Sequence, residues 1–137
     1  MILVDTSIWS LCLRRNPKDL NPTEQKLVVE LLSVIGSGEA ALIGPIRQEL
    51  LSGIRRIKDF RKLQAQLATF PLLEIEAADY DQAATFFNTC RTRGIVATPI
   101  DLLICAGAAR FDAAIFTSDS DFQQFAKWLP IKLHSVV

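Results

Sequence analysis

The sequence predicts an α/β fold in which a parallel sheet of four to five strands lies between helices on both faces. Short apolar runs alternate with longer segments whose apolar residues recur every three or four positions, and this alternation is typical of parallel α/β proteins. The first run is continuously apolar, as in strands buried on both faces. At 137 residues, half of them hydrophobic, the chain is predicted to form one domain over residues 1–137.

The first half contains two predicted strands, at residues 1–4 and 40–43. Asp5, Thr6 or Ser7 can cap a helix that follows the first strand. A second helix is predicted to end at Gly36, and a third begins at Gly44 and is interrupted at residues 52–53. A fourth is expected over residues 57–69.

The second half contains three further predicted strands, at residues 72–75, 113–116 and 131–134. Helices are expected over residues 77–93 and 122–128, the first with Tyr80, Ala83, Ala84 and Phe87 facing inward. Another helix opens at Thr98-Pro99, and its residues 101–111 are apolar almost all round. We therefore expect that helix to be central and buried.

Charge and cysteine usage limit the function classes. Fifteen basic and fifteen acidic residues cancel, so a nucleic-acid partner would need a local basic patch. Basic residues do cluster within 14–18 and 55–62, although such runs also occur on solvated helix faces. The three cysteines, Cys12, Cys90 and Cys105, are odd in number and too scattered for a zinc site. With no signal peptide or membrane span evident, we expect reduced thiols in a cytoplasmic protein.

Four carboxylates fall at related positions. Asp5 follows the first strand, Asp119 follows the fourth, Asp101 lies in the first turn of the buried helix, and Glu49 lies on the helix after the second strand. In open α/β sheets, ligand sites gather at the carboxyl ends of the strands. We therefore expect these acids to approach one edge of the sheet.

Each acid also has a simpler interpretation. Asp5 and Asp119 could cap helices, Asp101 fits a capping box with Thr98, and Glu49 could lie in solvent. Capping does not explain the further acid Asp121. Converging carboxylates without basic partners would raise one another's pKa values, and a divalent cation bound by hard oxygen ligands removes that repulsion. The pattern favours Mg²⁺ or Mn²⁺ as the cofactor.

The sequence resembles the PIN-domain family, and within it the VapC-type toxin ribonucleases of type II toxin–antitoxin systems. The matching stretches are ILVDTSIW at 2–9, GPIRQELLSGI at 44–54, TPIDLLICAGA at 98–108 and IFTSDSDFQQF at 115–125. The resemblance implies a PIN-like, Rossmann-like three-layer α/β/α fold and an Mg²⁺- or Mn²⁺-dependent endoribonuclease. It also implies a homodimer and a small antitoxin protein as partners.

The resemblance assigns roles residue by residue. The four acids of the family's active site correspond to Asp5, Glu49, Asp101 and Asp119, and the metal ligands are expected to be the three aspartates. Its supporting positions correspond to Thr6, Thr117 and Asp121. Such a site would hydrolyse RNA phosphodiester bonds through a metal-activated water. Nearby basic residues are expected to guide the RNA backbone, and they are Arg14, Arg15, Arg47, Arg55 and Arg56.

Two other functions compete with this hypothesis. Asp119 and Asp121 form a D-x-D, which would suit a phosphatase with an aspartyl nucleophile, but such enzymes place that motif after the first strand. A PIN domain that binds RNA or protein without cutting it is the alternative from a different class. All four acids are present here, whereas a degenerate member should lose some of them. No G-K-[ST] or complete dinucleotide motif supports nucleotide binding.

Overall fold

Strand β1, Ile2–Val4, is the centre of a parallel sheet. The computed structural model describes residues 1–136, and within them the sheet has five strands in the order β3-β2-β1-β4-β5. The other strands are β2 Ala40–Ile43, β3 Leu72–Leu73, β4 Ala114–Phe116 and β5 Lys132–Leu133. The predicted α/β class is confirmed, and the sheet has five strands, where four to five were expected.

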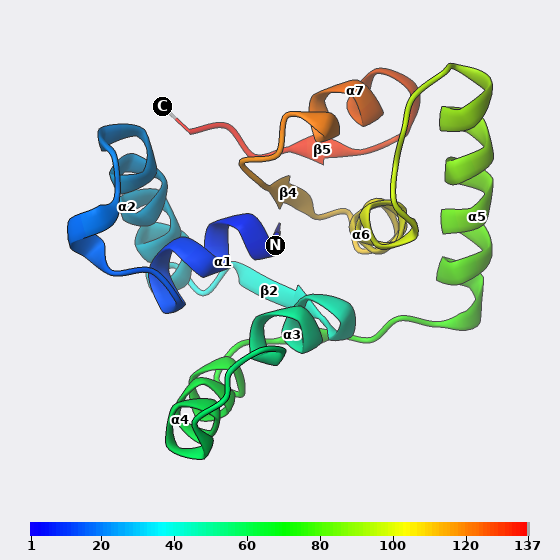
Figure 1. The fold of residues 1–137 in the computed structure, drawn as a ribbon. Coiled ribbons are helices and arrows are strands. Elements are labelled where there is room, and N and C mark those ends of the chain that lie inside the picture. Colours follow the sequence, from blue (N-terminus) through cyan, green and yellow to red (C-terminus); the bar gives the residue numbers. More distant parts are fainter. Residues whose placement is uncertain (137) are drawn as a thin grey trace.

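Helices cover the sheet on both faces. They are α1 Thr6–Leu13, α2 Pro22–Gly36, α3 Gly44–Leu51, α4 Ile57–Leu67, α5 Ala77–Thr92, α6 Pro99–Arg110 and α7 Asp121–Trp128, with a 3₁₀ turn at Pro17–Asp19. Figure 1 shows α2 to the left of the strands, and α5 and α6 to the right. This is the three-layer arrangement expected of an alternating parallel α/β chain.

The pairing of β1 with β4 positions the first acid. Leu3 lies opposite Ala41 of β2 and Ile115 of β4, and all three side chains are fully buried. One residue beyond β1, the Asp5 N–H donates to the Phe116 carbonyl at 2.8 Å. This bond holds Asp5 at the carboxyl edge of the sheet, directly beside the end of β4.

Helix α6 is the buried central helix that its composition predicts. Every residue from Leu102 to Ala108 is buried. A Cβ atom at Gly107 would lie 3.2 Å from the Ile75 side chain. Glycine at this position therefore lets α6 pack closely against Ile75. With the helix fixed in the core, its N-terminus and Asp101 are fixed as well.

The inward face of α5 differs from the prediction. Its buried residues are Asp79, Ala83, Phe86 and Cys90, whereas Tyr80 is 56% exposed. Of the other predicted inward residues, Ala83 is buried and Phe87 is half-buried against the core, whereas Ala84 is exposed. The buried face of α5 is rotated from the predicted one because Asp79 faces α6, where it accepts a hydrogen bond from Arg110 Nε at 2.8 Å. An ion pair therefore occupies a position that hydrophobic spacing alone assigns to an apolar residue.

The other differences lie at element ends. Strands β3 and β5 contain two residues each, and α4 ends at Leu67. Helix α3 ends at Leu51, and Gly53 with φ of +87° turns the chain toward α4. All three cysteines carry free thiols, as expected. None of the helices described here combines the length and hydrophobicity needed to cross a membrane.

Candidate functional site

Asp5 occupies the N-cap position of α1, but its side chain does not cap the helix. Its Oδ2 instead accepts hydrogen bonds from the hydroxyls of Ser7 and Thr117, each at 2.9 Å. The residue is only 9% exposed. The cap interpretation of Asp5 is therefore wrong, and the carboxylate belongs to a polar cluster between the ends of β1 and β4.

The loop after β4 closes around this carboxylate. Thr117 Oγ1 also accepts from the Asp119 N–H at 3.0 Å, and Ser7 Oγ accepts from the Ser118 N–H at 3.1 Å. Asp119 Oδ1 in turn accepts from the Asp121 N–H at 2.9 Å, at the start of α7. The cap interpretation of Asp119 therefore holds for one of its oxygens. The Thr117 hydroxyl, which donates to Asp5, and the Ser118 N–H, which donates to Ser7, tie the loop to the start of α1.

Asp101 approaches the same cluster from α6. It forms the predicted capping box, in which its N–H donates to Thr98 Oγ1 and its Oδ2 accepts from the Thr98 N–H. Burial raises the pKa of Asp101, the two Thr98 hydrogen bonds lower it, and the negative charges of Asp119 and Asp5 raise it again. The net shift is upward. The structure thus brings three predicted aspartates into electrostatic contact, and it brings them from three different elements.

Glu49 lies at the rim of this cluster. The side chain is exposed on α3, and its Oε2 accepts a hydrogen bond from Thr6 Oγ1 at 3.0 Å. Thr6 thus holds Glu49, while Thr117 holds Asp5. Asp121 is exposed at the start of α7. Glu49 and Asp121 are absent from the charges that shift the pKa of Asp101.

Each of the four acids keeps one oxygen available. Within residues 1–136, protein donors reach one oxygen of Asp5, Asp101, Asp119 and Glu49, and no salt bridge involves any of them. Carboxylate oxygens of this kind are the ligands that Mg²⁺ and Mn²⁺ prefer. In the same part of the chain, no three acidic, imidazole or thiol groups are gathered closely enough to bind a metal as they stand. A metal ion at this edge would therefore be held in part through water placed between the ion and some of the carboxylates.

Cys105 lies on α6 one turn beyond Asp101. Burial raises the pKa of its thiol well above the usual range, and Asp101, Cys90 and Asp5 raise it further. The thiol therefore stays protonated beneath the aspartates. Metals are bound by the thiolate form of cysteine. Protonated Cys105 is therefore not a metal ligand, and the available ligands are the carboxylate oxygens.

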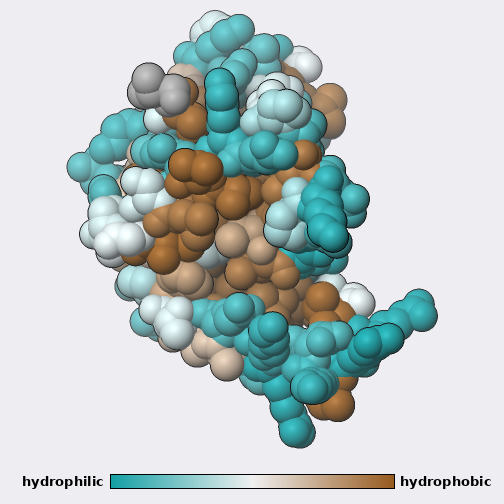
Figure 2. Space-filling model, turned by 90° about the vertical axis from the view of Figure 1, so that its left-hand side faces the viewer, coloured by the Kyte–Doolittle hydropathy of each residue, from teal (hydrophilic) through white to brown (hydrophobic). Residues whose placement is uncertain are grey.

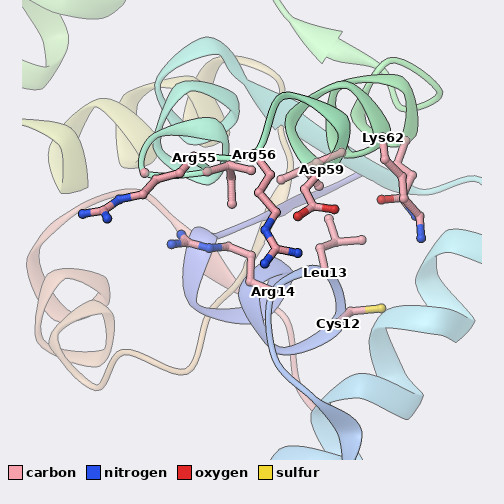
Figure 3. A pocket seen from close by; sticks show the side chains of 11 residues that line it. Cys12, Leu13, Arg14, Arg55, Arg56, Asp59 and Lys62 are labelled. Carbon is pink, nitrogen blue, oxygen red and sulfur yellow. The ribbon is translucent and has the colours of Figure 1, made fainter.

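The predicted RNA-guiding arginines separate into two groups. Arg14, Arg55 and Arg56 line one cavity, together with Lys62, which the sequence analysis did not select (Figure 3). Arg15 instead forms a 3.5 Å salt bridge with Glu24. Arg47 is half-buried on α3 and lies outside the cavity lining.

Ser7 is the site residue that sequence reasoning missed. It bonds both Asp5 and the loop after β4. The available signal was its position two residues after an acid at a helix start, where short hydroxyl side chains often bond locally. That signal could not show that Ser7 also reaches residue 118.

The fold and this edge define a Rossmann-like α/β domain with an acidic site at the carboxyl ends of its strands. A family model described as the PIN domain matches residues 2–127. The chain therefore belongs to the PIN domain family. PIN domains are nucleases, and membership supports a hydrolase.

Solved structures with the same fold include toxin–antitoxin assemblies. FitAcB from Neisseria gonorrhoeae has 21% identity and a TM-score of 0.76, covering 98% of this chain and 97% of that one. VapBC2 from Rickettsia felis, bound to a promoter DNA fragment, has 18% identity and a TM-score of 0.75, with 98% of each chain covered. A toxin–antitoxin complex from Klebsiella pneumoniae has 17% identity and a TM-score of 0.68, covering 89% of this chain and 90% of that one. No curated protein matches the chain by sequence.

Proposed function

We propose that the chain is an Mg²⁺- or Mn²⁺-dependent endoribonuclease and the toxin of a toxin–antitoxin pair. The observation that carries this proposal is the convergence of three aspartates: the charges of Asp5 and Asp119 act on Asp101, and none of the three has a basic salt-bridge partner among the described residues. Mutual repulsion of this kind is relieved by a bound cation. Family membership supplies the reaction class.

In this proposal, each residue has a role that its contacts support. Asp5, Asp101 and Asp119 hold the ion directly or through water, and Glu49 at the rim orients water or helps a second ion. When bound, the ion would supply positive charge that activates water and stabilises charge developing on the phosphate. Ser7 and Thr117 keep Asp5 in place, and Thr6 does the same for Glu49.

The proposed partners follow from the family and from the surface. Figure 2 shows a hydrophobic band between hydrophilic margins on the side of the molecule where α2 and α4 lie in Figure 1. An exposed apolar band of this kind suits a protein partner, and we assign it to an antitoxin. The proposal also includes a homodimer, a cytoplasmic location, and a single PIN domain over residues 1–137.

The experiment is a cleavage assay on a circular RNA, which an endonuclease opens and an exonuclease leaves intact. We expect cleavage with Mg²⁺ or Mn²⁺ and none with a chelator. Asp5→Asn and Asp119→Asn should each reduce the rate by about a hundredfold or more, as expected for loss of a metal ligand. Asp81→Asn, an exposed position on α5, is the matched control. Cleavage that persists in the chelator or in both site variants would refute the mechanism, and cleavage of a matching DNA circle alone would refute the RNA assignment.

A further inference from the structure

A second charged feature of the molecule lies outside the acidic edge. A cavity of about 680 Å³ opens between the C-terminal end of α1 and the segment from Gly53 to α4. Figure 3 shows Arg14, Arg55 and Arg56 reaching its opening from these two segments, with Lys62 on the far side. We call this cavity the α1–α4 pocket. None of the four acids described above lines it.

The charges in the α1–α4 pocket are unbalanced. It contains four basic side chains and one carboxylate, Asp59. Within residues 1–136, no salt bridge joins Asp59 to any of them, and none of the four forms a salt bridge elsewhere. Cations gathered in this way repel one another. A ligand with negative charge would relieve that repulsion.

We propose that the α1–α4 pocket binds a phosphate of the RNA backbone at a point remote from the bond that is cut. This inference rests on the proposed function, because it concerns the same substrate. Guanidinium groups bind phosphate with paired hydrogen bonds, and several of them around one opening form a site suited to it. The ligand class is therefore a single-stranded polyribonucleotide, recognised through its backbone and not through its bases.

One face of α1 connects the pocket to the acidic edge. Thr6, Ser10 and Leu13 are all half-buried, and their spacing of four and three residues places them on the same side of the helix. Thr6 contacts Glu49 at one end of this face, and Leu13 lines the pocket at the other. The continuity of this face favours RNA over an acidic peptide.

The length of α1 sets the number of nucleotides between the two sites. Asp5 and Arg14 flank the helix, and nine residues at 1.5 Å each separate them by about 13 Å. A stacked strand rises about 3.4 Å per nucleotide, so this distance spans about four nucleotides. An RNA of about twelve nucleotides can reach both sites, whereas a dinucleotide cannot.

The test measures RNA binding by the full chain in a chelator, so that cleavage does not interfere. The variant is Arg14→Ala/Arg56→Ala, and the control is Lys26→Ala/Arg91→Ala, which removes two cations that do not line the pocket and that form no salt bridge with any residue from 1 to 136. Loss of each phosphate contact should weaken binding of an RNA of about twelve nucleotides on the order of tenfold at about 50 mM salt. The slope of log affinity against log salt should shrink by about 1.4 for two contacts. The control should bind as the wild type does.

Three results would overturn the inference. The first is an equal effect of the two double variants on the longer RNA. The second is an equal loss for a dinucleotide, which would show a general effect of charge. The third is unchanged RNA binding by Arg14→Ala/Arg56→Ala together with lost binding of an acidic octapeptide, which would assign the pocket to a protein partner. If the wild-type protein binds RNA through the α1–α4 pocket but does not cut it, the proposed function is refuted and the inference that the pocket binds RNA is supported.

Discussion

The starts of α5 and α6 have the same local structure and opposite electrostatic surroundings. In each helix the third residue is an aspartate, Asp79 or Asp101, whose carboxylate accepts a hydrogen bond from the backbone N–H of the residue before the helix. Asp79 faces Arg110, whereas Asp101 faces Asp5 and Asp119. A cap motif therefore shows where an acid begins a helix, and the tertiary partner decides what the acid does there.

The two pKa values follow this difference. Burial would raise the pKa of Asp79, but hydrogen bonds from Arg110 and from the Glu76 N–H, with the charge of Arg110, lower it overall. The pKa of Asp101 is raised. Asp79 is thus stabilised in its charged form by the fold, whereas the surroundings of Asp101 disfavour its charged form. The first arrangement stabilises the protein, and the second costs stability.

The largest expected effect comes from Asp101→Asn. We expect RNA cleavage to fall by about a hundredfold or more, because a proposed metal ligand is lost. The melting temperature should not fall, since the amide oxygen can still accept from the Thr98 N–H and the repulsion from Asp5 and Asp119 disappears. Cleavage kinetics and thermal unfolding in a chelator measure both. A clear fall in melting temperature would show that Asp101 serves chiefly as a cap.

The second variant, Asp79→Asn, should lower the stability of the protein and leave its activity unchanged, the reverse of Asp101→Asn. Asp79→Asn removes the buried, 2.8 Å partner of Arg110 and leaves it only the exposed Glu76 at 3.9 Å, and we expect the Tm to fall by about 5 °C. Cleavage below the melting transition should stay close to wild type, because Asp79 contacts Arg110 at the C-terminal end of α6, whereas Asp101 lies at the N-terminal end. The same assays apply. If Asp79→Asn lost activity while keeping its Tm, the division between the two helix starts would be wrong.

The pH dependence of unfolding should separate the two residues in the metal-free protein. The folded pKa of Asp79 is lowered from 3.8, so its contribution to stability is present above pH 3.8 and is lost as pH falls through the lowered value. The folded pKa of Asp101 is raised from 3.8, so its contribution is present below pH 3.8 and is lost as pH rises through the raised value. Relative to wild type, Asp79→Asn should therefore recover in acid, and Asp101→Asn should gain stability toward neutral pH. Parallel profiles for the two variants would contradict this assignment.

The smallest effect should come from Thr98→Ala. It removes the hydroxyl that accepts from the Asp101 N–H, and loss of a cap costs about 1 kcal/mol of unfolding free energy. Asp101 keeps its bond from the Thr98 backbone, so we expect cleavage to fall less than about tenfold. Thr98→Ser, which restores the hydroxyl, should recover both. A loss as large as that of Asp101→Asn would mean that the cap hydroxyl itself belongs to the reaction.

The sequence was sufficient where one local pattern decided the structure. The glycine at residue 36 correctly predicted the end of α2, and the apolar run after Asp101 identified α6 as buried. It failed on the face of α5, because the rotation of that helix depends on Arg110, which lies 31 residues after Asp79. No local pattern contains that information.

The candidate site shows the same limit. Asp5, Asp101 and Asp119 could be selected because each acid follows a strand or starts a helix at one edge of the sheet. Ser7 and Lys62 could not, since a helical serine and a helical lysine look the same whether or not a distant segment meets them. Arg15 was selected for its neighbours in sequence, and Glu24 pairs with it in the structure.

The hydrogen bonds from the Ser118 N–H to Ser7 and from the Thr117 hydroxyl to Asp5 have a consequence for synthesis of the protein. The loop that completes the surroundings of Asp5 is made 112 residues after Asp5 itself. At about 5–20 residues per second, that delay is roughly 6 to 22 s. During this interval a nascent chain has neither Asp119 nor the strand that places it beside Asp5. A protein proposed to cut RNA thus becomes competent only after the loop at residues 117–119 has been made and has met Asp5.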